Sequence, residues 1–307
     1  MTLNIEAQGI QVYIDGRRVS AADAKVSVFD RGLLYGDSVF ETLATRGGRP
    51  FMLTEHVRRL RRSAELVYID LPVSDDQLCC ELEEATLASS NAESCLRLTV
   101  TRGVGELGLD PSHSEGPCRI LILTPLQRPA AEAYENGVGA IVYRTQRTAE
   151  ATEATGAKVG NYLVAVLAMR QAKAVGANEA LIVSGDGKVV EGSTSNLFFR
   201  VGNVLRTPPV SAGILPGITR ELVLEAAQSL SLTVQLQCPT PVELMQSDEI
   251  FITSSIRELL AVVTVDGVQI GDRLPGPTYH ALWQAYQTLA AEKLVMQPRF
   301  SCRQDIR

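Results

Sequence analysis

The sequence predicts an α+β protein of two domains. The chain has 307 residues, and one domain commonly holds roughly 100–200 residues. Runs of alternating apolar and polar residues surround the pair Asp15-Gly16, whose residues tolerate positive φ, while other stretches repeat apolar residues at helical spacing. Hairpin signals are too abundant for a pure strand–helix–strand repeat, so we expect mixed sheets.

The first predicted domain, residues 1–126, combines a β-rich start with two helices. Thr54 can cap the first helix, whose apolar residues recur at helical spacing. Ser74 and Gln77 have the spacing of a capping box, which opens the second helix. The strands expected after the hairpin are 38–44, 51–53, 95–101 and 119–123.

A polar stretch that contains Pro129, residues 127–136, is predicted to link the two domains. The second domain, residues 137–307, alternates strands, helices and tight turns. Its expected helices are 161–174, 219–230 and one near the C-terminus. Its expected strands are 139–143, 179–184, 233–236, 249–253 and 260–265, with three more that end at Gly192, Arg200 and Thr207.

Composition favours work on small molecules. Hydrophobic residues make up 45% and charged residues 21% of the chain, close to ordinary globular usage. The net charge of −6 argues against broad affinity for nucleic acid or anionic membrane. The cysteines lack CxxC spacing and nearby histidines, so we expect no metal site, no disulfide framework and a reducing compartment. The longest apolar run is far below the ~20 residues that span a bilayer, and no signal peptide is evident, so we expect a cytoplasmic protein.

Lys158 is the first candidate for chemistry. It lies between the small-residue loop 155–157 and the most apolar helix of the chain. Burial there would favour the neutral amine, which Schiff-base chemistry with an aldehyde requires, and pyridoxal phosphate is the commonest aldehyde cofactor. The alternative is that Lys158 caps the loop or reaches solvent.

Glu191 and the start of a later helix suit the same cofactor. A carboxylate at Glu191, where a strand ends, could face the pyridine nitrogen and strengthen the ring as an electron sink. Gly217 precedes an amphipathic helix, so the backbone N–H groups of Ile218 and Thr219 could bind a phosphate. The alternatives are a solvated strand end and an ordinary helix start.

Further phosphate donors are available elsewhere in the sequence. The hydroxyls of residues 253–255 follow an apolar strand, and Arg59 could add a bidentate charge. The cluster Arg58–Arg62 could instead form a solvated helix face or an anion- or nucleic-acid-binding module without catalysis. A thiol enzyme built on Cys79-Cys80 is another alternative, although no histidine has a recognisable pairing with them in sequence.

Several motifs, taken in order, resemble the class IV aminotransferases, which are fold type IV pyridoxal-phosphate enzymes. The motifs are FDRGLLYGDSVFET, EHVRRL, AKVGNYL, VVEGSTSNLF, GILPGITRELV and ITSSIRELLAVVTVDG. The family includes branched-chain aminotransferases, D-amino acid aminotransferases and 4-amino-4-deoxychorismate lyases. The resemblance implies a smaller N-terminal α/β domain, a larger C-terminal pseudo-barrel domain that binds the cofactor, and a homodimer.

The resemblance also implies roles for single residues. Lys158 resembles the catalytic lysine that holds the cofactor and shuttles a proton, Glu191 the partner of the pyridine nitrogen, and Tyr162 a tyrosine beside the cofactor. The implied phosphate ligands are Arg59, Ile218, Thr219 and Ser255. The implied substrate-binding residues are Tyr35, Phe40, Arg97, Ser254 and Ile256.

The implied reaction is ping-pong transfer of an amino group between an amino acid and a 2-oxo acid such as 2-oxoglutarate. The segments 35–41 and KVGNYL resemble the branched-chain enzymes, and 104–110 lacks the Arg and His of typical D-amino acid enzymes. Two residues depart from the branched-chain pattern: Thr42 replaces a usual Gly and resembles the lyases, and Ala44 replaces a frequent pocket arginine. Branched-chain transamination is favoured; aminodeoxychorismate cleavage is the main alternative, followed by D-amino acid transamination.

Overall fold

The structure, a computed structural model, describes residues 8–144 and 154–301. The chain forms two compact units. Unit 1 comprises Met1–Gln127, Ala157–Asn161 and Leu294–Arg307, and unit 2 comprises Arg128–Gly156 and Tyr162–Lys293. The short segment that contains Lys158 therefore packs with unit 1.

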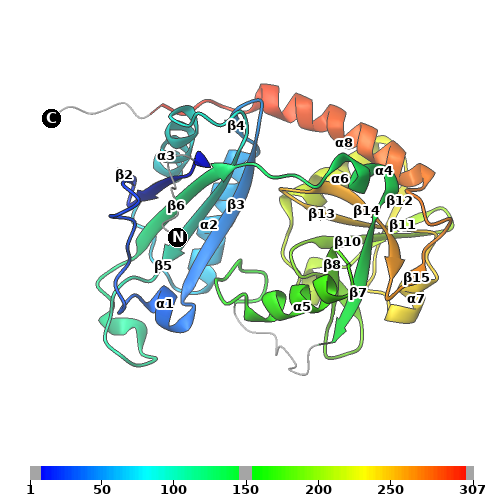
Figure 1. The fold of residues 1–307 in the computed structure, drawn as a ribbon, viewed down its shortest axis with the longest axis horizontal. Coiled ribbons are helices and arrows are strands. Elements are labelled where there is room, and N and C mark those ends of the chain that lie inside the picture. Colours follow the sequence, from blue (N-terminus) through cyan, green and yellow to red (C-terminus); the bar gives the residue numbers. More distant parts are fainter. Residues whose placement is uncertain (1–7, 145–153, 302–307) are drawn as a thin grey trace. The chain divides into compact units, whose positions relative to one another are not determined.

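Unit 1 is built on a six-stranded antiparallel sheet in the order β2-β1-β6-β5-β3-β4 (Figure 1). The strands are β1 Gln11–Ile14, β2 Arg17–Val19, β3 Ser38–Arg46, β4 Arg49–Pro50, β5 Ser94–Thr101 and β6 Cys118–Pro125. The predicted hairpin is confirmed, with Asp15 at φ 50° and Gly16 at φ 79°. The predicted strand 51–53 is wrong: Phe51 and Met52 form a turn, and Leu53 begins a helix.

Unit 1 also contains α1 Arg31–Tyr35, α2 Leu53–Leu66, α3 Asp75–Leu87 and the short 3-10 helix Pro111–His113. The cap of α3 is as predicted, because the Ser74 side chain accepts a hydrogen bond from the Gln77 N–H at 3.1 Å. The predicted Thr54 cap is wrong. The Phe51 N–H donates to the Ala44 carbonyl at 3.0 Å, so the chain reverses at Met52, which takes the N-cap position at φ 54° without a side-chain cap.

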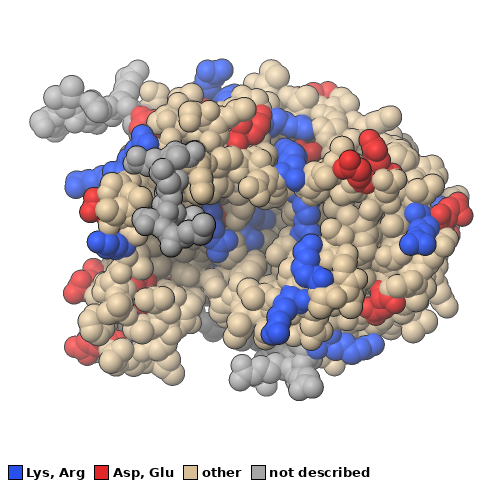
Figure 2. All heavy atoms as spheres, viewed as in Figure 1, with Lys and Arg blue, Asp and Glu red and all other residues tan. Residues whose placement is uncertain are grey.

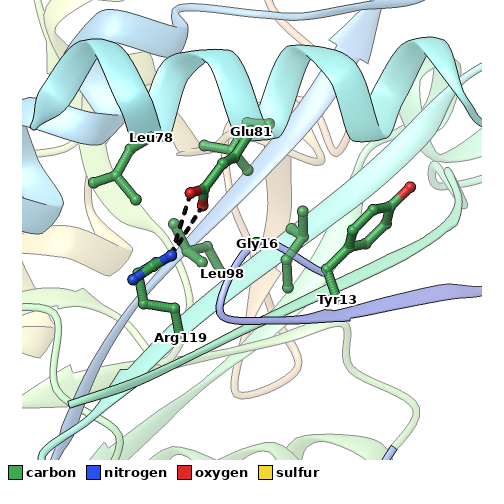
Figure 3. A pocket seen from close by; sticks show the side chains of 8 residues that line it. Tyr13, Gly16, Leu78, Glu81, Leu98 and Arg119 are labelled. Atoms are coloured by element: carbon green, nitrogen blue, oxygen red, sulfur yellow. Dashed lines mark hydrogen bonds and ion pairs between the residues drawn. The ribbon is translucent and has the colours of Figure 1, made fainter. Parts of the chain in front are cut away.

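The core of unit 1 lies between the sheet and the helices α2 and α3. Its buried residues include Val39, Leu43, Leu53, Leu60, Leu78, Leu82, Leu96 and Leu121. At its edge, Glu81 of α3 meets Arg119 of β6 at 3.2 Å beside Gly16 (Figure 3). The Arg119 N–H also donates to the Asp15 carboxylate at 2.9 Å, which ties the hairpin turn to β6.

Unit 2 contains a mixed nine-stranded sheet in the order β12-β11-β10-β13-β14-β7-β8-β9, with β15 paired to β14. The strands are β7 Val138–Arg144, β8 Glu179–Val183, β9 Val189–Gly192, β10 Asn196–Val201, β11 Val204–Thr207, β12 Thr233–Leu236, β13 Glu249–Ser254, β14 Glu258–Val265 and β15 Val268–Gln269. The pairs β7–β8, β7–β14 and β11–β12 are parallel and the others antiparallel. The predicted α+β class and mixed sheet are confirmed.

The helices of unit 2 are α4 Ala131–Asn136, α5 Leu163–Ala174, α6 Ile218–Ser229, α7 Pro241–Met245 and α8 Pro277–Met296, with a 3-10 turn at Val210–Ala212. The stretch expected to be a plain linker thus contains α4. The short α7 was not predicted, although Thr240 and Glu243 form a capping box there. The core includes Leu181, Val189, Leu197, Phe199, Leu244, Ile250, Ile252 and Leu260.

The face of the molecule drawn in Figure 2 carries both basic and acidic side chains, and most of its residues are neither. Within the described ranges, no helix has the length and apolarity needed to cross a bilayer. Cys79, Cys95, Cys118 and Cys238 are free thiols, whereas Cys80 is disulfide-bonded, which the cysteine spacing did not predict.

Candidate functional site

Lys158 is anchored beside β3 of unit 1. The Phe40 N–H donates to the Lys158 carbonyl at 2.9 Å, and the Lys158 N–H donates to Ser63 Oγ at 3.1 Å. Two residues on, the Gly160 N–H donates to the Ser38 carbonyl at 2.7 Å, and a Cβ at Gly160 would lie 2.1 Å from Ser38 Oγ. The glycine therefore lets the lysine segment lie against the strand. The Lys158 side chain is half-buried, with Nζ 4.5 Å from the Phe40 ring centroid.

Phe40 also contacts a second cation. Its ring is 2% exposed, and the guanidinium carbon of Arg97 lies 3.9 Å from the ring centroid. Arg97 is exposed on β5, opposite Thr42 of β3. Cations over an aromatic face are attracted by its quadrupole. This part of unit 1 therefore presents an accessible guanidinium and a half-buried amine around one apolar ring.

Glu41, the neighbour of Phe40, joins two residues of α2. Arg59 donates from Nε to Glu41 Oε1 at 2.7 Å and from Nη2 to Oε2 at 2.8 Å, and His56 Nδ1 lies 2.7 Å from Oε2. Glu41 is 1% exposed. Burial raises its pKa, but the charges of Arg59 and His56 and their hydrogen bonds outweigh burial and hold the pKa at about 2. Burial lowers the pKa of His56, against the opposing effect of Glu41.

This cluster was only partly anticipated from the sequence. Arg59 was predicted as a phosphate ligand, and in the structure its guanidinium is bidentate to Glu41. The phosphate role of Arg59 stays a prediction. His56 was not predicted; its spacing of three residues from Arg59, which places both on one helix face, is the available signal.

Tyr35 lies at the end of α1 and contacts the segment 104–110. Its hydroxyl accepts a hydrogen bond from the Gly108 N–H at 2.9 Å. Arg31, which is 3% exposed, donates to the carbonyls of Gly108 at 3.0 Å and Leu109 at 3.2 Å, and to the Asp37 carboxylate at 3.1 Å. Arg31 therefore holds this segment in place, a role that the sequence did not indicate.

In unit 2, Glu191 of β9 is fixed to the segment that leads into α6. Its Oε2 accepts hydrogen bonds from the Leu215 N–H at 3.1 Å and from Asn196 Nδ2 at 3.4 Å. Asn196 Nδ2 also donates to the Leu215 carbonyl at 2.9 Å. A Cβ at Gly217 would lie 1.8 Å from Asn196 Oδ1, so any larger residue there would displace the Asn196 side chain. The structure therefore brings Glu191 and the entry to α6 together.

The start of α6 has the features of an anion site. Gly217 occupies the N-cap position and no side chain caps the helix. Ile218 is half-buried and Thr219 buried in the first turn. Unpaired N–H groups at a helix N-terminus, together with the helix dipole, attract anions. Thr253, opposite Asn196 in the sheet, has a buried hydroxyl without a hydrogen-bond partner among the described residues.

The remaining predicted residues of unit 2 lie at element ends. Ser254 ends β13, and its hydroxyl accepts from the Arg257 N–H at 3.2 Å. Ser255 and Ile256 follow in the same turn and are half-buried. Tyr162, half-buried, precedes α5. Within the described ranges, no group of three or more His, Cys, Asp or Glu is arranged to hold a metal ion.

A carboxylate braced beside an uncapped helix start, with a buried hydroxyl on the adjacent strand, fits a group that carries both a ring nitrogen and a phosphate. Pyridoxal phosphate has this chemistry. The residues present in unit 2 therefore suit the cofactor that the resemblance implies.

Comparison with known proteins places the chain in a family. Residues 38–265 match the family of class IV amino-transferases. The putative branched-chain-amino-acid aminotransferase of Methanocaldococcus jannaschii is 37% identical over 91% of this chain and 96% of its own length. The D-alanine aminotransferase of Bacillus licheniformis is 34% identical over 87% of this chain and 93% of its own.

Solved structures agree. The branched-chain aminotransferase of Escherichia coli has a TM-score of 0.86, at 31% identity, over 92% of this chain and 95% of that one. A branched-chain aminotransferase from T.th. in complex with N-(5'-phosphopyridoxyl)-L-glutamate has a TM-score of 0.83, at 29% identity, over 92% and 94%. Because the family match spans well over half of the chain, this protein belongs to the class IV aminotransferases and has their type IV fold.

Proposed function

We propose that this aminotransferase uses pyridoxal phosphate to move an amino group from a branched-chain amino acid to a 2-oxo acid such as 2-oxoglutarate, by a ping-pong cycle. The observation that carries the proposal is the Glu191 carboxylate, braced by Asn196 and Leu215 beside the uncapped start of α6. The phosphopyridoxyl compound named in the structure of a relative supports the cofactor.

The chain's own groups divide the work. When bound, pyridoxal phosphate supplies an aldehyde that condenses with amines and a ring that withdraws electrons. The Lys158 amine holds the cofactor and then moves a proton at the α-carbon of the substrate. Glu191 keeps the ring nitrogen protonated. The N–H groups of Ile218 and Thr219, with Ser255 and Arg59, bind the phosphate.

Substrate choice rests on Phe40 and Arg97. The exposed Arg97 guanidinium suits the carboxylate of an amino or oxo acid, since guanidinium and carboxylate pair with two hydrogen bonds. The Phe40 ring is 2% exposed, and its part in the proposal is to hold the Arg97 guanidinium 3.9 Å from its centroid. Tyr35, Ser254 and Ile256 complete the proposed substrate contacts, and the names of the branched-chain relatives point the same way.

Spectroscopy and one lysine variant test the cofactor. The purified protein should be yellow, and borohydride should bleach it and leave the cofactor attached to Lys158. Lys158→Ala should lose turnover at least ~1,000-fold, on the order of a full general acid–base contribution, yet bind some cofactor through its phosphate. Lys173→Ala is the matched control, because Lys173 is exposed at the end of α5. A wild-type protein that binds no pyridoxal phosphate would refute the proposal.

A donor panel tests the reaction. Glutamate formed from 2-oxoglutarate with L-leucine or L-valine supports branched-chain transamination. Amino transfer from D-alanine instead would favour the activity of the second relative. Pyruvate released from aminodeoxychorismate without any amino acceptor would favour the lyase, which the Thr42 departure suggests.

We also propose a homodimer. On α5 of unit 2, four apolar residues in the first turn and a half are exposed: Leu163 at 68%, Val164 at 48%, Val166 at 60% and Leu167 at 42%. Contiguous exposed apolar side chains mark association surfaces, and most soluble oligomers are symmetric homo-oligomers. Sedimentation equilibrium should give twice the chain mass, and Val166→Glu should shift it toward the monomer.

A further inference from the structure

Glu179 is a buried carboxylate that the proposed chemistry does not use. It is the first residue of β8 and has no exposed surface. Its side chain lies beside the turn 192–196 that joins β9 to β10. The two ends of that turn are next to Glu191 and at Asn196, which together brace the start of α6. Contacts that fix this turn therefore also fix Glu191, the proposed partner of the ring nitrogen.

Six donors converge on the Glu179 carboxylate. They are the N–H groups of Ala180 and Ser193, the hydroxyls of Ser193, Thr194 and Ser195, and the guanidinium of Arg257. Arg257 Nη2 lies 2.7 Å and Ser195 Oγ 2.8 Å from Oε2. A carboxylate offers about four lone-pair directions, so this one is saturated. Three consecutive hydroxyls of the turn thus face one internal anion.

The turn leaves no free space around this anion. A Cβ at Gly192 would lie 2.2 Å from Ser195 Oγ and 3.0 Å from the carboxyl carbon of Glu179. The Gly192 N–H donates to the Ser195 carbonyl at 2.7 Å, which closes the turn on itself. A larger residue directly after Glu191 would therefore displace the Ser195 hydroxyl from its place beside Glu179.

Arg257 links the Glu179 carboxylate to a second turn, the one that begins at Ser254. Besides the Glu179 carboxylate, it contacts Thr194, and it donates from its backbone N–H and from Nε to Ser254 Oγ, at 3.2 and 3.4 Å. The next residue, Glu258, has φ 56° and pairs with Arg128 at 2.9 Å. Non-glycine residues in this conformation are strained and persist where surrounding contacts fix them. The turn that contains Ser254 and Ser255 is therefore held from both sides.

We propose that Glu179 is a positioning residue of the cofactor site: together with Arg257, it fixes the turn after Glu191 and the turn at Ser254–Ser255 relative to each other. This inference rests on the proposed function. Glu179 does not touch the cofactor; it sets the direction from which Glu191 meets the ring nitrogen and from which Ser255 meets the phosphate.

The charge of Glu179 is essential to this role. Burial raises its pKa, but Arg257 and the surrounding hydrogen bonds lower the pKa by more than burial raises it. The pKa of Glu179 therefore lies below its ordinary value, and the group is ionised at neutral pH. Only the anion accepts from all six donors, because the amide of a glutamine would point a donor at groups that are themselves donors. Glu179→Gln keeps the size and removes this match.

The test measures cofactor binding by the apoprotein, not turnover alone. For Glu179→Gln, we expect the dissociation constant of pyridoxal phosphate to rise about tenfold, the effect of losing one charged hydrogen bond. The pH midpoint of the bound cofactor's absorption band should also shift, because Glu191 moves. Ser195→Ala, a milder change, should weaken binding in the same direction by a few-fold.

Glu249→Gln is the matched control. Glu249 is also buried in unit 2, pairs with Arg200 at 2.9 Å and accepts from the N–H groups of Thr278 and Tyr279. It starts β13, whose other end is at Ser254. Its loss should lower the melting temperature yet leave the dissociation constant of pyridoxal phosphate within about twofold.

Two results would overturn the inference. One is wild-type affinity and an unchanged absorption midpoint in both Glu179→Gln and Ser195→Ala. The other is an equal loss of affinity in Glu249→Gln, which would trace the effect to general destabilisation.

The wild-type protein distinguishes failure of this inference from failure of the proposed function. If the wild-type protein binds pyridoxal phosphate in those experiments, only this inference fails; if it binds none, the proposed function fails with it.

Discussion

Glu41→Gln is the sharpest probe of how unit 1 is held together. The change keeps the size of the side chain and removes the charge that joins Arg59 and His56. The carboxyl has a pKa of about 2 in the folded chain, against an ordinary value of 4.5. A group whose pKa is depressed by folding contributes stability above its unfolded pKa, and this contribution is lost as the pH falls toward the folded value.

The magnitude follows from the two pKa values. Each pH unit of difference corresponds to ~1.4 kcal/mol, so Glu41 contributes about 3 kcal/mol at pH 7. At pH 3.5 the unfolded carboxyl is already mostly protonated, and the same expression leaves about 2 kcal/mol. Removing one partner of a buried ion pair costs about 3–5 kcal/mol, which is the same range.

Urea unfolding followed by far-ultraviolet circular dichroism, at pH 7 and at pH 3.5, measures both values. The gap between wild type and Glu41→Gln should be about 3 kcal/mol at pH 7 and should narrow by about a third at pH 3.5. Glu225→Gln is the control, because its pair with Lys293 at 2.8 Å is exposed to solvent and such pairs contribute about 0–1 kcal/mol. A difference in unfolding free energy under about 1 kcal/mol at pH 7, or one that is the same at both pH values, would refute the reasoning.

Two further predictions concern His56 and Gly217. Because burial lowers the pKa of His56 below its ordinary 6.5, the unfolded chain takes up a proton first as the pH falls, so stability drops from pH 7 to pH 5. His56→Gln should reduce the change of the thermal unfolding temperature between pH 7 and pH 5. An equal change in the variant and the wild type would contradict this. Gly217→Ala should displace Asn196, since its Cβ would lie 1.8 Å from Oδ1; we expect about 1–3 kcal/mol lower stability and weaker pyridoxal phosphate binding in a titration, and unchanged binding would count against the Glu191 bracing.

Features that depend on neighbouring residues were predictable from the sequence. The Asp15-Gly16 hairpin and the Ser74–Gln77 cap form as expected, because backbone conformation and one short hydrogen bond determine them. The Thr54 cap failed because another local signal, the Gly47-Gly48 turn of the β3–β4 hairpin, was missed. That hairpin brings the Phe51 N–H to the Ala44 carbonyl, so the helix begins at Leu53 with Met52 at its N-cap position.

In the candidate site, Lys158, Glu191 and the start of α6 were predicted because each belongs to a recognisable motif or helix start. Their supports were not, because they lie far apart in sequence: Glu179 and Arg257 are 78 residues apart, and they meet only once β8 and the β13–β14 turn are placed in one sheet. The sequence identifies donors and acceptors, and the fold decides which of them meet.

The arginine cluster of α2 shows how burial settles a choice that composition leaves open. Four arginines at 58–62 suggest a basic face, but the helix turns them in different directions. Arg58 and Arg62 are exposed, whereas Arg59 is bound to Glu41, and Arg61 pairs with Asp75 and donates to the Leu71 carbonyl. A buried carboxylate without a cation costs several kcal/mol, so Glu41 requires one arginine internally. Two of the four arginines, Arg58 and Arg62, then remain as a solvated helix face, and the Arg59 guanidinium is held in a fixed position by Glu41.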